Sequence, residues 1–376
     1  MAAPILPGST LGILGGGQLG RMFCTASRNM GYQLNVLDPD PDSPAGHIAD
    51  DHVEAAYTDR DALDYMAHSC DVITTEFENV PAESMRYLAR SKPVYPSAEV
   101  LEIAQNRNRE KVFASKAGLT PAASHPVVDE SDLEQAISIT GLPAILKTAT
   151  LGYDGKGQYV VESLQQAQQA FRDSGAVECV LEKKIELKQE ISAIVARNRQ
   201  GDTAVYPVGE NEHRNGILYI TIVPARVDEA IAARARQQAL QLVEELDYVG
   251  VLAVEFFIDS NNELLFNEMA PRPHNSGHYT EDACVTSQFE QQARVICGLP
   301  PGDVTLLSPV VMVNLLGDLW RPDWPVLLNE PDVKLHLYGK KEARPGRKMG
   351  HYNVLDSDPE RALATARKIF SLLSAG

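Results

Sequence analysis

Residues 249–278 read Val-Gly-Val-Leu-Ala-Val-Glu-Phe-Phe-Ile-Asp-Ser-Asn-Asn-Glu-Leu-Leu-Phe-Asn-Glu-Met-Ala-Pro-Arg-Pro-His-Asn-Ser-Gly-His. This stretch predicts two apolar strands, 249–259 and 263–270, joined by Ser260, Asn261 and Asn262. Because asparagine tolerates the positive φ of a tight hairpin, we expect a two-residue turn at Asn261-Asn262.

In that register Glu255 lies directly opposite Glu268, and both carboxylates project from one face of the sheet. Like charges directly opposite destabilise a strand pair, and one carboxylate is expected to keep its proton. A divalent cation between them removes the conflict, and Mg²⁺ selects hard oxygen ligands in a site completed by phosphate. A solvated acidic face is the alternative, but Glu255 lies inside an apolar run and Asn267-Glu268 interrupts another. We interpret the hairpin as a magnesium–nucleotide site.

Composition restricts the class of protein. A chain of 376 residues, 44% apolar and 23% charged, is long enough for two or three globular domains. Its apolar runs are well short of a membrane span, and its N-terminus lacks the pattern of a signal peptide. The five cysteines show no paired short spacing, which indicates a reducing cytosol. The net charge of −17 argues against nucleic acid or an anionic membrane as partner.

The first hundred residues alternate strands and helices. We expect strands at 10–16, 33–37 and 71–77, and helices at 18–30 and 82–90. This alternation is typical of a parallel, doubly wound sheet, so the chain is placed in the α/β class.

Residues 15–20, Gly-Gly-Gly-Gln-Leu-Gly, fit G-x-G-x-x-G, and Asp38 ends the next strand. The motif is a dinucleotide fingerprint, but a single match is weak evidence for NAD. Its physical content is a set of backbone amides and a helix N-terminus that can approach a polar ligand. Glu76 and Glu78 follow the third strand, where ligands of parallel sheets gather, although plain loop acids are the alternative.

A glycine-rich segment, 152–158, separates two expected strands, 144–149 and 159–162. With Lys147 and Lys156 beside them, its amides can fold over a polyphosphate. A simple hairpin is the alternative, and snorkelling to the surface is the ordinary account of Lys147. Before it, residues 99–118 predict one polar helix that carries Arg107.

Two further features are weaker. The strand 179–185 followed by Glu190 is a candidate to hold an adenine amino group and a ribose hydroxyl. His213 falls in an expected polar turn between strands 204–208 and 217–223, where a surface histidine is the ordinary interpretation.

Five basic residues fall within nine positions near the C-terminus: Lys340, Lys341, Arg344, Arg347 and Lys348. A solvated basic turn is the ordinary account. Pro345-Gly346 between two arginines nevertheless fixes a turn suited to gripping a phosphate monoester through guanidinium groups.

Five motifs follow one another in order, at 15–20, 75–80, 152–158, 267–278 and 344–351. Together they resemble the ATP-grasp superfamily and, within it, the N5-carboxyaminoimidazole ribonucleotide synthetases, the ATP-dependent carboxylases of bacterial and fungal purine synthesis. The resemblance covers essentially the whole chain. It implies a Rossmann-like substrate domain (1–105), a small lid domain (106–186), a larger antiparallel catalytic domain (187–305) and a C-terminal subdomain with the basic loop (306–376).

The resemblance also implies roles for individual residues. The implied ATP residues are Arg107, Lys147, Gly152, Tyr153, Asp154, Gly155, Lys156, Gly157, Gln158, Glu182, Lys183, Lys184, Ile185, Glu190, His213, Asn267 and Glu268. Glu255 and Glu268 would bind Mg²⁺, with Mn²⁺ as a substitute. The implied catalytic residues are Arg272, His274 and Asn275, which would hold bicarbonate and carboxyphosphate, together with Tyr153 and Lys340. Gln18, Leu19 and Glu76, with Tyr153, would contact aminoimidazole ribonucleotide. Its phosphate would meet Lys340, Arg347 and Lys348, with Lys341 as the alternative to Lys340.

The implied reaction joins bicarbonate to aminoimidazole ribonucleotide at the expense of ATP. Bicarbonate attacks the γ-phosphorus, and the exocyclic amine captures the carboxyl group from carboxyphosphate or from CO₂ released from it. Because carboxyphosphate hydrolyses readily, the glycine loop is expected to act as a lid. The resemblance implies a cytoplasmic homodimer that passes its product to N5-carboxyaminoimidazole ribonucleotide mutase, without nucleic acid or membrane partners.

Three alternatives stay open. The first is a related ATP-grasp enzyme, such as formate-dependent glycinamide ribonucleotide transformylase or biotin carboxylase, although no Met-Lys-Met biotinylation site occurs. The second, an NAD-dependent dehydrogenase, leaves Glu255, Glu268 and the basic loop unexplained. The third, a catalytically silent nucleotide-binding module, would not need both carboxylates.

Overall fold

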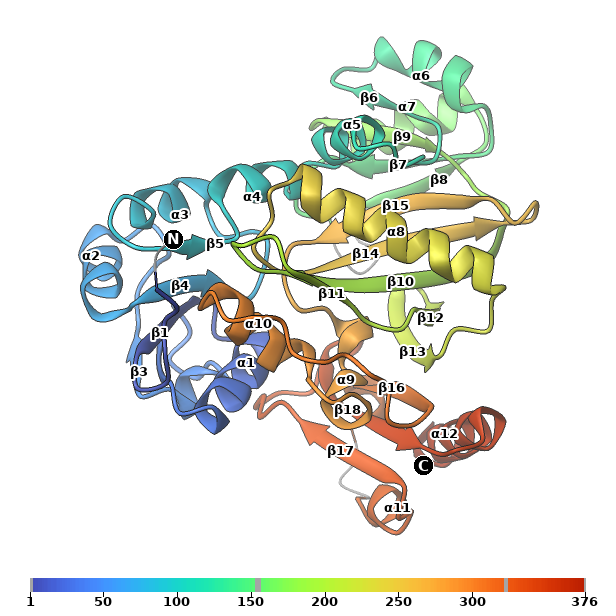
Figure 1. Cartoon of the computed structure of the whole chain (residues 1–376). Coiled ribbons are helices and arrows are strands. Elements are labelled where there is room, and N and C mark those ends of the chain that lie inside the picture. The colour runs from blue at the N-terminus through green and yellow to red at the C-terminus, as the bar shows by residue number, and fades with distance from the viewer. Residues whose placement is uncertain (1–2, 153–156, 321–323, 375–376) are drawn as a thin grey trace.

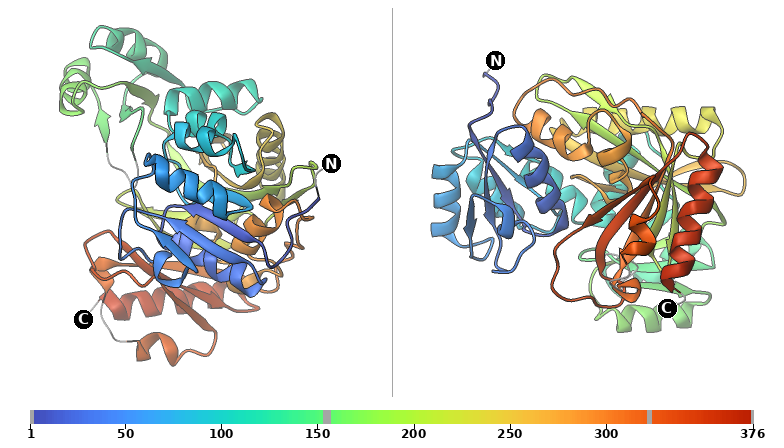
Figure 2. Two further views of the ribbon diagram at one scale, coloured as in Figure 1. Left: turned by 90° about the vertical axis from the view of Figure 1, so that its left-hand side faces the viewer. Right: turned by 90° about the horizontal axis from the view of Figure 1, so that it is seen from below.

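The computed structural model describes residues 3–152, 157–320 and 324–374. The described chain forms three sheets with helices around them (Figure 1). Figure 2 shows the N-terminal sheet and the C-terminal strands on opposite sides of the molecule in its right-hand view.

The N-terminal sheet is five-stranded and parallel, as expected, in the order β3-β2-β1-β4-β5. Its strands are β1 (Thr10–Leu14), β2 (Gln33–Leu37), β3 (Asp51–Val53), β4 (Val72–Thr75) and β5 (Val94–Tyr95), and its helices are α1 (Gln18–Asn29), η1 (Gly46–Ile48), α2 (Arg60–Ser69) and α3 (Ala82–Leu88). The α/β prediction is confirmed. Because the strands are parallel, the residues that follow β1 and β4 lie at one edge.

The single helix expected over 99–118 is wrong. Two helices are present instead, α4 (Ala98–Ala104) and α5 (Arg107–Lys116). The break lies at Asn106, whose side chain accepts hydrogen bonds from the backbone N–H groups of Asn108 and Arg109. This N-cap satisfies amides at the start of α5 and places Arg107 in its first turn.

A small antiparallel sheet stands apart at the top of Figure 1, in the order β6-β9-β7-β8. It contains β6 (Ser124–Val127), β7 (Ala144–Thr148), β8 (Gln158–Val161) and β9 (Cys179–Lys183), with helices α6 (Asp132–Thr140) and α7 (Leu164–Asp173). Its core joins Leu133, Leu146 and Phe171.

The largest sheet is antiparallel and runs in the order β15-β14-β10-β12-β13-β16-β18-β17, with β11 paired to β10. Its strands are β10 (Leu187–Arg197), β11 (Thr203–Val205), β12 (Gly209–Arg214), β13 (Ile217–Val223), β14 (Gly250–Asp259), β15 (Leu264–Ala270), β16 (Val310–Leu316), β17 (Val333–Leu337) and β18 (Lys348–Leu355). The accompanying helices are α8 (Glu229–Glu245), η2 (Asn275–Gly277), α9 (Thr280–Ala283), α10 (Gln288–Ile296), η3 (Gly317–Leu319), α11 (Pro325–Leu328) and α12 (Pro359–Ser374). The sheet continues past residue 305, while the three boundaries between the four domains stay predictions.

Two strands of this sheet differ from the sequence prediction. The expected polar turn around His213 is wrong, because residues 209–214 form β12, paired to both β10 and β13. The strand β18 was not expected, because the polar residues His351 and Asn353 interrupt its apolar run, although both are fully buried. Within the described residues, no helix combines the length and the apolar character needed to cross a membrane.

The β14–β15 hairpin has the predicted pairing but a different turn. The expected two-residue turn is wrong: Asp259 N–H donates to the Glu263 carbonyl at 3.1 Å, and three residues close the loop, with Asn262 at φ 63°. A register shift after Glu255 compensates, because Phe256 pairs with Phe266 while Glu255 still pairs with Glu268. The two acids therefore face each other as predicted.

The N-terminal sheet is anchored to the largest sheet through α1 and α10. Phe23 of α1 and Phe289 of α10 belong to one buried core. Gln292 of α10 donates from its amide to Thr74 Oγ1 at 3.0 Å and accepts from the Val251 N–H at 2.6 Å. This bridge fixes the end of β4 beside β14.

Candidate functional site

Two adjoining cavities lie where the three sheets meet. One has a volume of about 420 Å³ and extends from the ends of β1 and β4 to the segment after β15. The other, about 270 Å³, lies between the hairpin, β10, β12 and the small sheet. Five residues line both cavities: Arg107, Glu268, His274, Asn275 and Lys348. Two different ligands could therefore meet at these five side chains.

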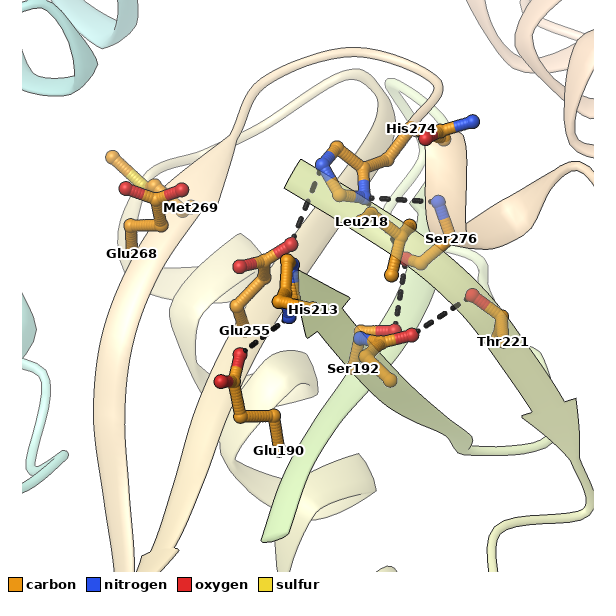
Figure 3. A network of polar contacts seen from close by, with 12 residues as sticks. Glu190, Ser192, His213, Leu218, Thr221, Glu255, Glu268, Met269, His274 and Ser276 are labelled. Atoms are coloured by element: carbon orange, nitrogen blue, oxygen red, sulfur yellow. Dashed lines mark hydrogen bonds and ion pairs between the residues drawn. The ribbon is translucent and has the colours of Figure 1, made fainter. Parts of the chain in front are cut away.

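The two hairpin carboxylates lie at this junction (Figure 3). Glu268 forms an ion pair with Arg107 at 2.9 Å, and Glu255 lies 3.4 Å from His274 Nε2. Burial and the charge of Glu268 raise the pKa of Glu255 to about 7. Burial opposes ionisation of Glu268 too, but the charge and hydrogen bond of Arg107, together with the charges of Lys147 and Lys111, outweigh burial and lower the pKa of Glu268. The pKa values of the two facing acids are therefore shifted in opposite directions, as expected for like charges that face each other, and retention of a proton by one of them stays a prediction.

His213 is not a surface histidine. It lies on β12 with 19% of its side chain exposed, lines the second cavity, and pairs through Nδ1 with Glu190 at 2.8 Å (Figure 3). Burial acts to lower its pKa, but the hydrogen bond and charge of Glu190 outweigh burial, so the pKa of His213 is raised.

Lys147 is not a snorkelling lysine either. Glu182 forms ion pairs with Lys147 at 2.9 Å and with Lys111 at 3.1 Å, and all three side chains are nearly fully buried. Burial opposes ionisation of Glu182, yet the two ammonium groups lower its pKa to about 2. Two cations share one carboxylate, so this cluster is net positive, and its Lys147 lines the second cavity.

The glycine loop after β1 has its amides already occupied. Glu76 accepts hydrogen bonds from the N–H groups of Gly17 at 2.5 Å and Gly20 at 2.7 Å. Asp38 accepts from the Gly16 N–H at 2.6 Å. Because carboxylates of the chain itself accept from Gly16, Gly17 and Gly20, these three amides are not available to a dinucleotide pyrophosphate.

Three family models match consecutive parts of the chain. A ribonucleotide synthetase preATP-grasp domain matches residues 9–105, an ATP-grasp domain matches 112–289, and a phosphoribosylaminoimidazole carboxylase C-terminal domain matches 310–365.

The chain is also similar to curated proteins over nearly its full length. It is 47% identical over 354 residues to the N5-carboxyaminoimidazole ribonucleotide synthase of Bacillus subtilis, covering 93% of this chain and 92% of the relative. It is 46% identical to the synthase of Brucella melitensis, covering 92% and 96%. The chain belongs to the N5-carboxyaminoimidazole ribonucleotide synthase family.

Solved structures agree with this synthase family. An ADP complex of an N5-carboxyaminoimidazole ribonucleotide synthetase superposes with a TM-score of 0.93 at 45% identity, covering 98% of both chains. An Aspergillus clavatus synthase in complex with ADP and 5-aminoimidazole ribonucleotide gives 0.90 at 31% identity, covering 98% and 99%. This chain is thus an ATP-grasp ligase of the synthase family, and the dehydrogenase alternative is wrong.

The residues expected from the synthase resemblance divide between the cavities. The second cavity is lined by Arg107, Lys147, Gln158, Glu190, His213, Glu255, Asn267 and Glu268. The first is lined by Gln18, Leu19, Glu76, Gly152 and Arg272, besides the five shared residues. Tyr153, Asp154, Gly155 and Lys156 lie outside the described residues, and the cavity linings given by the described residues do not include Gly157, Glu182, Lys183, Lys184, Ile185, Lys340 or Arg347. The ligand assignments themselves stay predictions.

The basic loop reaches the cavities through Lys348. Lys340 Nζ donates to the Lys348 carbonyl at 2.7 Å, and Arg347 donates to the Glu342 carbonyl at 3.0 Å. Lys341 instead forms an ion pair with Asp42 of the N-terminal domain at 2.5 Å. These contacts favour Lys340 over Lys341 as a residue directed toward the synthase cavities.

Glu110 was not predicted from the sequence, and Glu78 was noted after the third strand without its partner. Glu78 forms an ion pair with Arg272 at 2.5 Å. Burial opposes ionisation of Glu78, but the charge and hydrogen bond of Arg272 outweigh burial and lower its pKa. Glu110 lines the first cavity, accepts the Met269 N–H at 2.6 Å, and has its pKa raised to about 8 by burial and by Glu268. The available signal for Glu110 was its spacing from Arg107, three residues apart on one helix face.

Proposed function

We propose that this synthase-family chain carboxylates 5-aminoimidazole ribonucleotide with bicarbonate and ATP, giving N5-carboxyaminoimidazole ribonucleotide, ADP and phosphate. The observation that carries the proposal is the pair of cavities joined at Arg107, Glu268, His274, Asn275 and Lys348. ATP belongs in the second cavity and the ribonucleotide in the first, so that the γ-phosphate and the acceptor amine approach the junction from opposite sides.

The hairpin fits Mg²⁺. Two carboxylates oppose each other in β14 and β15. Burial and repulsion by Glu268 raise the pKa of Glu255. Oxygen donors from protein and polyphosphate are the ligand set that Mg²⁺ prefers, so Glu255 and Glu268 would hold it. The ion would supply neutralisation of triphosphate charge.

The chain's own residues then account for each step. Lys147, beside its shared partner Glu182, and His213 supply positive charge to the nucleotide cavity. Arg272, His274 and Asn275 would position bicarbonate so that its oxygen attacks the γ-phosphorus, breaking the bond to ADP.

The carboxyl group is then transferred to the ribonucleotide. A carbon–nitrogen bond forms to the exocyclic amine, the carbon–oxygen bond to phosphate breaks, and the released phosphate takes the amine proton. Gln18 and Glu76 line the cavity in which the ribonucleotide would bind. Lys340, Arg347 and Lys348 are assigned to its phosphate. The guanidinium of Arg347 can bind a phosphate monoester through two hydrogen bonds, and the two lysines supply positive charge.

The wider setting follows from the family resemblance. We assign a cytoplasmic homodimer that passes its product to N5-carboxyaminoimidazole ribonucleotide mutase. The five cysteines are all free thiols, which supports a reducing compartment.

The test is phosphate release from ATP, Mg²⁺ and bicarbonate, with and without aminoimidazole ribonucleotide. Release should depend on bicarbonate and rise when the ribonucleotide is added. Glycinamide ribonucleotide with formate is the control for the related transformylase. Stimulation by that pair, and none by aminoimidazole ribonucleotide, would contradict the proposal.

A further inference from the structure

The ring of His274 is held at its Nδ1 by two groups of Ser276. The Ser276 backbone N–H donates to Nδ1 at 3.3 Å, and Ser276 Oγ lies 2.9 Å from the same atom. A backbone N–H can only donate, so Nδ1 must be the acceptor and carries no proton.

The Ser276 hydroxyl is oriented in turn by Ser192 of β10. Ser192 Oγ donates to Ser276 Oγ at 2.8 Å, and both side chains are essentially fully buried (Figure 3). Because Ser276 Oγ accepts this bond, its own hydrogen is available to His274 Nδ1. The three side chains therefore form a directed chain of hydrogen bonds, from Ser192 through Ser276 to the imidazole.

The proton of the neutral ring then lies on Nε2. That atom faces Glu255 at 3.4 Å and lies at the junction of the two cavities. Because Nδ1 accepts the Ser276 N–H and carries no proton, the ring has a single N–H and is neutral.

We propose that Ser276 and Ser192 are positioning residues that fix His274 as the neutral Nε2–H tautomer, so that His274 donates a hydrogen bond to an anionic carboxylate or phosphate oxygen rather than acting as a base. The proposal rests on the function proposed above. Glu255 would hold the metal, and the Nε2–H of His274 would then be free to donate to the anion bound at the junction. Removal of the Ser276 hydroxyl leaves the weaker backbone contact alone to define the tautomer.

The test is the ¹⁵N spectrum of the histidine rings in the full-length protein without substrate, with His274→Gln to assign the signals. The native protein should show an unprotonated Nδ1 and a protonated Nε2 for His274. A native Nδ1 that carries the proton would overturn the proposal, whatever the variants do.

Ser276→Ala and Ser192→Ala should shift the tautomer populations of His274 and lower kcat about tenfold, with the KM for ATP nearly unchanged. Thr221→Val is the matched control, because Thr221 is buried in the same sheet and donates to Asn211 instead. Native tautomer signals and kcat in Ser276→Ala would also overturn the proposal. The tautomer is measured on the substrate-free protein, whereas the carboxylation assignment is tested by phosphate release. A failed tautomer proposal can therefore be told apart from a failed carboxylation assignment.

Discussion

The glycine loop after β1 and the β14–β15 hairpin both have sequence patterns associated with phosphate binding, but their polar groups are satisfied differently. In the glycine loop, Glu76 and Asp38 occupy the amides that a phosphate would need. In the hairpin, Glu255 and Glu268 oppose each other, and Arg107 is the ion-pair partner of Glu268 among the residues that the structure describes. A polar group that already has its partner supports the fold, whereas an uncompensated charge marks the place where a ligand is missing.

The largest effect should come from removing charge at the hairpin. Glu268→Gln should lower kcat about 1000-fold, because the electrostatic compensation of metal and triphosphate is lost. ATP-dependent phosphate release measures this effect. Glu263→Gln, at the exposed end of the same hairpin, is the control and should behave as the native enzyme. Unchanged ATPase activity in Glu268→Gln would refute the metal assignment.

The charge conflict should also appear as a pH dependence of stability. The folded-state pKa of Glu255 is raised to about 7, above its ordinary value of 4.5. The proton on Glu255 therefore stabilises the native state below pH 4.5, and this stabilisation is lost as the pH rises through 7.

Metal-free native protein should lose on the order of 3 kcal/mol from this group between pH 4.5 and 7, and Glu255→Gln should lack that component. Urea unfolding of both proteins across this range measures the difference. Glu110 and Glu281, whose pKa values are also raised by burial, contribute equally to both proteins and cancel. Parallel pH profiles would mean that Glu255 is not the titrating group.

At the glycine loop, removal of the acid should lower the stability of the fold, because the acid already satisfies backbone amides there. Glu76→Ala leaves the Gly17 and Gly20 amides without their acceptor and should lower the free energy of unfolding by about 2 kcal/mol. Inorganic phosphate should partly restore the stability of this variant and have less effect on the native protein. Glu54→Ala, an exposed acid of the same domain, is the control. Native stability in Glu76→Ala would show that the loop does not depend on its internal anion.

The smallest effect concerns the basic loop. Arg347→Ala should raise the KM for the ribonucleotide about tenfold, roughly 1.4 kcal/mol, and change the KM for ATP much less. Arg344→Ala is the matched control, since Arg344 is exposed and pairs with Glu342 of its own loop. Equal changes in both KM values would move the ribonucleotide phosphate site elsewhere.

Local sequence patterns predicted the parallel sheet, the hairpin and the facing acids, because strand alternation and strand pairing leave a periodic trace. They failed where partners come from distant segments. The pairing of His213 with Glu190 depends on β12 lying beside β10, and the sharing of Glu182 by Lys111 and Lys147 joins α5 to the small sheet.

The hairpin turn shows a related limit. Its loop length was wrong by one residue, and the register shift after Glu255 cancelled that difference. A bulge of this kind has no local sequence signal as clear as that of a turn residue. The residue roles, in contrast, came from the family resemblance, and spacing alone would not have assigned them.

The most direct test of the facing-acid site is binding of Mn²⁺, as a spectroscopic substitute for Mg²⁺, measured by electron paramagnetic resonance with ADP present. The native enzyme should bind the ion with its nucleotide, and the variant carrying both Glu255→Gln and Glu268→Gln should bind it at least about tenfold more weakly. Equal binding of Mn²⁺ by the native and doubly substituted proteins would contradict the account.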